Sequence, residues 1–105
     1  MTHPMHESVT NLIQQAVVLM DDLLRFRIEL SEYSEKLKAL DVESVMVAYE
    51  NDFKRDATLV YYLDALMLLS SLQHELDFQV AEYGVNVALE DMRNLEELLK
   101  KFPKT

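Results

Sequence analysis

The sequence has no cysteine, one glycine and two prolines among its 105 residues. Without cysteine the chain can form no disulfide, no thiolate metal site and no covalent intermediate on a thiol. Sheets depend on turns, and turns draw on glycine and proline, so their scarcity favours a few long helices. A single glycine also excludes the glycine-rich loops that bind phosphate groups.

Basic residues are few as well. Ten lysines and arginines stand against nineteen aspartates and glutamates, which gives a formal net charge of −9. A negative surface repels polyanions, so direct binding to nucleic acid is disfavoured. No lysine or arginine lies between Arg55 and Arg93, and we expect this interval to present a continuous negative surface to a basic partner. The predicted acidic partner surface comprises Asp64, Glu75, Asp77, Glu82, Glu90 and Asp91.

Long apolar runs are missing too. The longest, Leu59 to Leu72, contains Asp64 and is too short to cross a bilayer. The first residues show no basic region followed by an apolar one, so no signal peptide is expected. We therefore expect a cytoplasmic protein that does not bind membranes. Residues 1–105 should form a single helical domain, in which 1–7 are a frayed lead-in.

Apolar residues do recur at alternating intervals of three and four between Val9 and Leu40. This heptad spacing predicts one continuous helix whose a and d positions face a partner helix. Further apolar residues widen the N-terminal half of the stripe, whereas the half after Phe26 is narrow. The a and d positions are Val9, Leu12, Ala16, Leu19, Leu23, Phe26, Leu30, Tyr33, Leu37 and Leu40.

The narrow half of this seam is the basis for predicted self-association. The later segments look too short to cover it, and soluble monomers rarely leave such an apolar strip in water. A second copy would close the strip symmetrically, because a two-fold contact uses the same patch twice. The alternative is that the segment 42–53 folds back over the strip. The predicted homodimer interface comprises Phe26, Leu30, Tyr33, Leu37 and Leu40.

The remaining segments also read as helices. Asp41 is a good N-cap for a second helix, which we expect to break or kink within 51–56. A third helix should occupy 57–83, and Gly84 either ends it or lies inside a longer one. The overall prediction is an all-α fold of three to four helices, arranged as an antiparallel bundle or long helical hairpin with coiled-coil-like packing, and dimeric.

No residue pattern indicates catalysis, a cofactor or a metal. Glu29, Glu32 and Glu35 have a spacing that could suggest metal ligands, but the heptad places them outside the seam, where carboxylates are solvated. His74 lacks a second histidine of the kind that di-iron helical proteins use. Arginines could hold an anionic substrate in a small helical enzyme, but Arg25 and Arg27 fall beside the seam rather than within it.

Three functions are consistent with these observations. We favour a non-enzymatic protein–protein interaction module, such as a small adaptor, regulator or chaperone that binds a partner helix through its apolar faces. The alternative is an acidic inhibitor or immunity-type protein that docks on a basic target, such as a nuclease or a DNA-binding protein. A small helical enzyme is the third.

Overall fold

The computed structural model of the chain describes residues 3–102, apart from the side chain of Val87. It is all-α, and the described residues include no strand. In chain order the elements are α1 (Pro4–Leu24), α2 (Leu30–Lys38), α3 (Val42–Ala48), α4 (Glu50–Arg55), the 3-10 helix η1 (Ala57–Leu59), α5 (Val60–Tyr83) and α6 (Asn86–Lys101).

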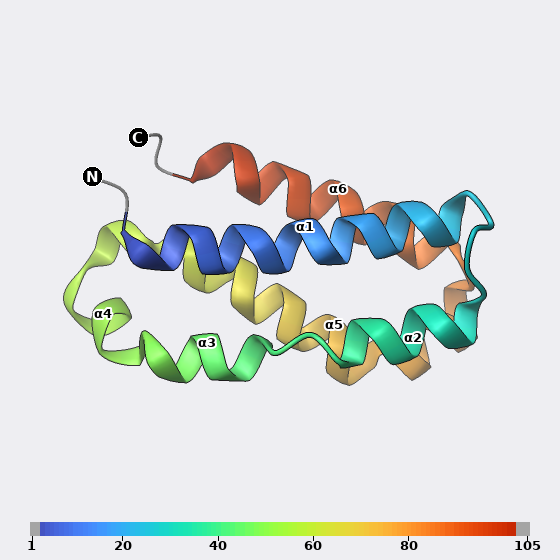
Figure 1. Cartoon of the computed structure of the whole chain (residues 1–105), viewed down its shortest axis with the longest axis horizontal. Helices are drawn as coiled ribbons and strands as arrows, with labels where there is room; N and C mark the ends of the chain where they lie inside the picture. The colour runs from blue at the N-terminus through green and yellow to red at the C-terminus, as the bar shows by residue number, and fades with distance from the viewer. Residues whose placement is uncertain (1–2, 103–105) are drawn as a thin grey trace.

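Helix α1 lies at the centre of the arrangement, in contact with α2, α3, α5 and α6. After α1 the chain reverses, and α2 and α3 run back along it; α5 then follows the direction of α1, and α6 returns (Figure 1). The core between these helices is built from apolar side chains, each worth roughly 1.5–3 kcal/mol when fully buried. Its largest fully buried members are Tyr33, Tyr62, Met5, Ile13, Met20, Leu37, Leu66, Leu69, Leu76, Leu95, Val9 and Val42.

The expected frayed lead-in over residues 1–7 is wrong for its described part, because α1 begins at Pro4. Proline suits the first turn of a helix, where its missing N–H has no intrahelical partner to lose. His3 caps the helix, since its Nδ1 accepts a hydrogen bond from the backbone N–H of Met5 at 3.0 Å. Met5 is fully buried and anchors this end in the core. Residues 1 and 2 lie outside the described part of the chain.

The predicted continuous helix over 9–40 is also wrong: α1 ends at Leu24 and α2 begins at Leu30. The end of α1 is a Schellman cap, a helix ending in which a left-handed residue turns the chain aside. Phe26 is that residue, with φ of +60°, and its N–H donates to the Leu23 carbonyl at 3.1 Å. The N–H of Arg27 donates to the Asp22 carbonyl at 2.8 Å.

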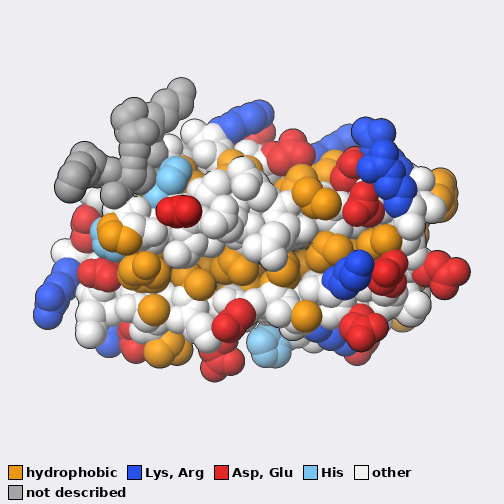
Figure 2. All heavy atoms as spheres, in the orientation of Figure 1, with side chains coloured by type: hydrophobic (Ala, Val, Ile, Leu, Met, Phe, Trp, Pro, Cys, Tyr) orange, Lys and Arg blue, Asp and Glu red, His pale blue; other side chains and the backbone are white. Residues whose placement is uncertain are grey.

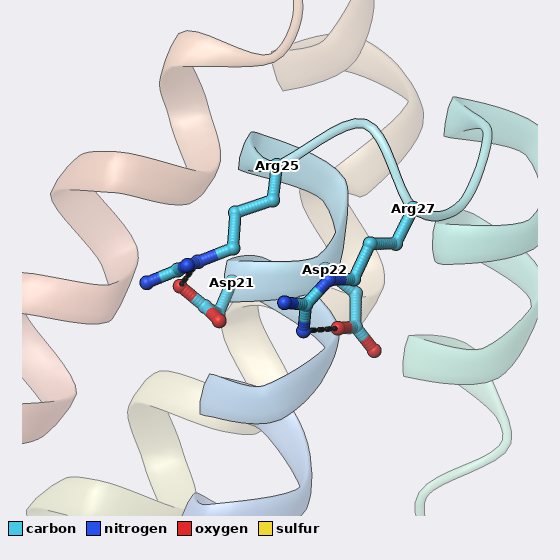
Figure 3. A network of polar contacts seen from close by, with 4 residues as sticks. All are labelled: Asp21, Asp22, Arg25 and Arg27. Carbon is cyan, nitrogen blue, oxygen red and sulfur yellow. Dashed lines mark hydrogen bonds and ion pairs between the residues drawn. The ribbon is translucent and has the colours of Figure 1, made fainter.

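Two ion pairs accompany this cap (Figure 3). Arg25 Nε lies 3.0 Å from Asp21 Oδ1, and an Arg27 guanidinium nitrogen lies 3.4 Å from Asp22 Oδ1. Both arginines are well exposed, so each pair contributes little to stability. The Arg27–Asp22 pair also matters for geometry. The same two residues are joined by a backbone hydrogen bond, so the ion pair supports the reversal of the chain at this point.

Hydrogen bonds from two side chains, Asp41 and Gln73, hold the later segments in place. Asp41 caps α3 by accepting from the Ser44 N–H at 3.2 Å, and this predicted cap is confirmed. Gln73 of α5 donates from Nε2 to the carbonyls of Leu37 and Leu40, at 2.9 and 2.7 Å. Leu37 lies in the last turn of α2 and Leu40 in the connection that follows it, so Gln73 ties the C-terminal end of α2 to α5.

Both of the later predicted breaks are present. The helix that begins at Val42 breaks at Asp56, within the predicted interval 51–56, and the Asp56 side chain caps η1; a further turn at Tyr49, between α3 and α4, was not predicted. Gly84 ends α5 with φ of +60°, which confirms the first of the two readings for this residue. The number of helices therefore exceeds the expected three to four, because the chain reverses after α1 and turns again at Tyr49.

Replacing Phe26 by glycine should stabilise the fold. The phenylalanine ring is 85% exposed, so its loss removes little packing, while glycine adopts a positive φ without steric cost. We expect the free energy of unfolding in urea to rise by about 1 kcal/mol for Phe26→Gly.

Phe26→Ala is the matched control, since alanine removes the ring but keeps the Cβ that strains this conformation. It should leave stability within about 0.5 kcal/mol of the wild type. Equal effects of the two substitutions would contradict the assignment of strain to this position.

Candidate functional site

The predicted homodimer interface does not form an exposed strip. Tyr33 and Leu37 are fully buried within the single chain, and Leu30 and Leu40 are half-buried against the core. Phe26 alone remains well exposed. The premise that this strip is uncovered is therefore wrong. The covering segments are those that α2 meets after the reversal, α1 and α5, and not a folded-back 42–53 segment.

The structure also divides the predicted acidic partner surface. Asp64, Glu75 and Glu82 are exposed and lie eleven and seven residues apart on α5, close to whole numbers of helical turns, so they share one side. Asp77 lies on another side and forms an ion pair with Lys38 of α2 at 2.9 Å. Asp91 is turned inward and only 8% exposed.

Glu90, the sixth predicted member of that surface, is exposed on α6. The outward side of α5 is not uniformly acidic, because Val60, Met67 and Phe78 are exposed along it. The surface of the interval 56–92 is therefore a mixture of carboxylates and large apolar side chains.

One groove lies between α3–α4 and α5 and has a volume of about 670 Å³. We call it the α3–α5 groove. Its apolar lining comes from Met46 and Val47 of α3, Phe53 of α4 and Leu63 of α5, and its polar lining includes Gln73 and His74 of α5 and two glutamates. Val47 is 65% exposed at this groove, and the exposed Met67 lies one turn from Leu63 on α5.

A second groove of about 560 Å³ lies between α1 and α2. We call it the α1–α2 groove; its lining includes Val18, Leu19 and Leu40. Figure 2 shows the surroundings of this groove as a band of apolar side chains between α1 and the row formed by α2 and α3. Three amide side chains of α1, Asn11, Gln14 and Gln15, lie beside these apolar groups in its lining.

The residues weighed as metal ligands or anion binders lie apart. Glu29, Glu32 and Glu35 are all exposed, and His74 Nδ1 lies 2.7 Å from the Ser70 carbonyl oxygen. Within residues 3–102, no three histidine, cysteine or acidic side chains are grouped so that they could hold a metal ion. Arg25 and Arg27 are each paired with an aspartate of α1, as described above.

The sequence prediction places Asp91 among the surface carboxylates, but this side chain is buried. Burial, and secondly the neighbouring Glu90 carboxylate, raise the pKa of Asp91 to about 6. Burial and then the Asp91 charge raise the pKa of Tyr33, whose buried hydroxyl has no hydrogen-bond partner among the described residues. The heptad pattern could have indicated this environment, since Asp91 lies three and four residues from the buried Ala88 and Leu95.

Comparisons with known proteins do not assign a function to these surfaces. No protein-family model, curated protein or solved structure matches the chain. Among the described residues, no helix is long and apolar enough to cross a membrane. Only the grooves and charges of the molecular surface therefore indicate a function.

Substituting Asp91 should change how stability depends on pH. An acid with a raised pKa in the folded state holds its proton more tightly there than when unfolded, so its ionisation destabilises the fold. This stabilisation is present below about pH 4 and is lost as the pH rises to about 6 and above. Asp91→Asn cannot ionise, so its advantage over the wild type should grow by about 2 kcal/mol between pH 4 and 7.5.

Urea denaturation at several pH values measures this difference. Glu96→Gln is the matched control, because Glu96 is an exposed carboxylate on the same helix and its removal should give no comparable trend. A constant difference between Asp91→Asn and the wild type across this pH range would show that the carboxyl is not destabilised by burial.

Proposed function

We propose that this chain is a non-enzymatic interaction module of the antiparallel helical-bundle type, an adaptor, regulator or chaperone that binds an amphipathic helix of another protein. The single observation that supports this function is the α3–α5 groove, with Val47 and Met67 exposed beside it. An amphipathic helix binds by laying its apolar face into such a groove between helices. We propose a cytoplasmic location as well.

The dimensions of the groove suit a short helix. Its α5 wall extends from Leu63 to His74, which at 1.5 Å per residue is about 16 Å, or three helical turns. A partner would present anchors at positions i, i+4 and i+7. Met46 suits varied anchors, because an unbranched methionine side chain adapts to different shapes.

The acidic rim indicates what should flank these anchors. Glu43 and Glu50 line the groove, and Glu50 is already 3.5 Å from Lys54. A basic residue of the partner would therefore be attracted mainly to Glu43. Such an exposed charge affects the rate of association and the orientation of the helix more than its affinity.

The acidic inhibitor remains the second candidate function, and one observation favours it. Asp64, Glu75 and Glu82 share one side of α5, and none of them forms an ion pair with another described residue. A basic target bound there would associate more slowly as salt is added. Binding in the apolar groove would depend little on salt and would show a negative heat-capacity change.

A homodimer also remains a prediction, although its interface has to differ from the strip first expected. The exposed apolar residues beside the α3–α5 groove give a second copy a surface to bind. Sedimentation equilibrium of the wild type and of Val47→Glu would show whether this occurs. A dimer that dissociates on this substitution would make a second copy the occupant of the groove.

The groove is tested by a pair of valine substitutions. Val47→Glu places a charge at the α3–α5 groove, whereas Val18→Glu places one at the α1–α2 groove; the two side chains are 65% and 58% exposed, so neither change should unfold the protein. The ligand is selected from a displayed library of helical segments from the proteome of the source organism. We expect Val47→Glu to weaken binding at least tenfold, or about 1.4 kcal/mol, and Val18→Glu to weaken it less than twofold.

Calorimetry measures the affinities, and amide chemical shifts of the labelled protein locate the bound segment. If Val18→Glu alone abolishes binding, the partner occupies the α1–α2 groove and the proposed site is wrong. If neither substitution changes the affinity but added salt does, the acidic side of α5 is the binding surface instead.

A further inference from the structure

A small polar cavity lies between the end of α5 and the start of α6, away from both grooves. We call it the Asp91 cavity; its volume is about 270 Å³. All of its lining side chains carry hydrogen-bonding groups, in contrast to the mixed apolar and polar lining of the α3–α5 groove. They are Gln79 and Tyr83 of α5 and Asn86, Glu90, Asp91 and Asn94 of α6.

One of these side chains, Asp91, is buried without a partner. It is only 8% exposed, and none of the described residues forms a hydrogen bond or an ion pair with its carboxylate. Gln79 is half-buried, and its Nε2 donates to Glu75 at 3.3 Å. The Gln79 Oε1 atom is a buried acceptor without a donor among the described residues, and the Asp91 carboxylate belongs to a side chain that is mostly buried. Such acceptors are costly unless something supplies donors, so the two groups indicate a ligand that donates hydrogen bonds.

The charges and the aromatic ring define the ligand further. Glu90 is exposed at the cavity and adds a second negative charge, next in sequence to Asp91. Adjacent residues on a helix point in directions about 100° apart, so the two carboxylates do not form one chelating pair. The exposed Tyr83 adds a ring face, which attracts cations and stacks on planar ones.

We infer that the Asp91 cavity binds the guanidinium group of an arginine side chain of a partner protein. A guanidinium carries five N–H donors in a planar fork, which matches acceptors that are spread around a cavity. A bare divalent ion fits less well, because calcium takes six to eight oxygen ligands at about 2.3–2.6 Å, and a cavity of this volume with two separated carboxylates does not enclose one. The inference does not rest on the α3–α5 groove, and either site can fail alone.

The probe is N-acetyl-arginine methylamide, which carries one guanidinium and no other charge. Titration into the isotopically labelled full chain at pH 7.5 should shift the side-chain amide signals of Gln79, Asn86 and Asn94 in a saturable way, with a dissociation constant on the order of 1–10 mM for so small a ligand. Asp91→Asn keeps the shape of the side chain and removes its charge, and it should weaken this binding about tenfold.

Glu96→Gln removes the same charge from an exposed position of α6 and should change the affinity less than twofold. The corresponding lysine compound, with a compact ammonium in place of the planar fork, should bind several-fold more weakly. The inference is overturned if these amide signals do not saturate, if the two substitutions weaken binding equally, or if calcium chloride saturates the same signals at lower concentration than the arginine compound.

Discussion

The reversal of the chain after α1 is the constraint on which the rest of the structure depends. If α1 continued through Phe26, the apolar residues of the following segment would project beyond the molecule. By turning back, the chain fully buries Leu37, at roughly 1.5–3 kcal/mol, and the ring of Tyr33, whose gain is reduced because its hydroxyl has no hydrogen-bond partner within residues 3–102. A non-glycine residue in the left-handed region costs about 1–2 kcal/mol, so the burial exceeds the strain. The positions of α3, α5 and both grooves follow from this turn.

Much of the fold could be predicted from the sequence, because its signals are local. The cap at Asp41 and the end of a helix at Gly84 are properties of a few neighbouring residues, and both are confirmed. The all-α class follows from the scarcity of turn residues. The reversal at Phe26 could not be read in this way. Heptad spacing continues through it, and the left-handed position at the helix end holds a phenylalanine instead of the glycine that usually marks such an end.

The candidate sites were harder to predict for a related reason. The sign of a charge is visible in a sequence, but its surroundings are not. Asp77 and Asp91 belong to the same acidic interval, yet one pairs with Lys38 and the other is buried beside Glu90. The α3–α5 groove is likewise a property of packing, since its walls come from two separate segments, 43–54 and 63–74, whose relative position the sequence does not show.

Gln73 joins these parts of the molecule in a way that bears on its dynamics. One amide group holds both the Leu37 and Leu40 carbonyls, and the same side chain lines the α3–α5 groove. The end of α2 therefore cannot fray without releasing a side chain in the middle of α5. Local opening of these two helices becomes one cooperative event rather than two. A segment bound in the α3–α5 groove would contact Gln73. It would therefore slow amide hydrogen exchange at the end of α2, which lies outside the groove.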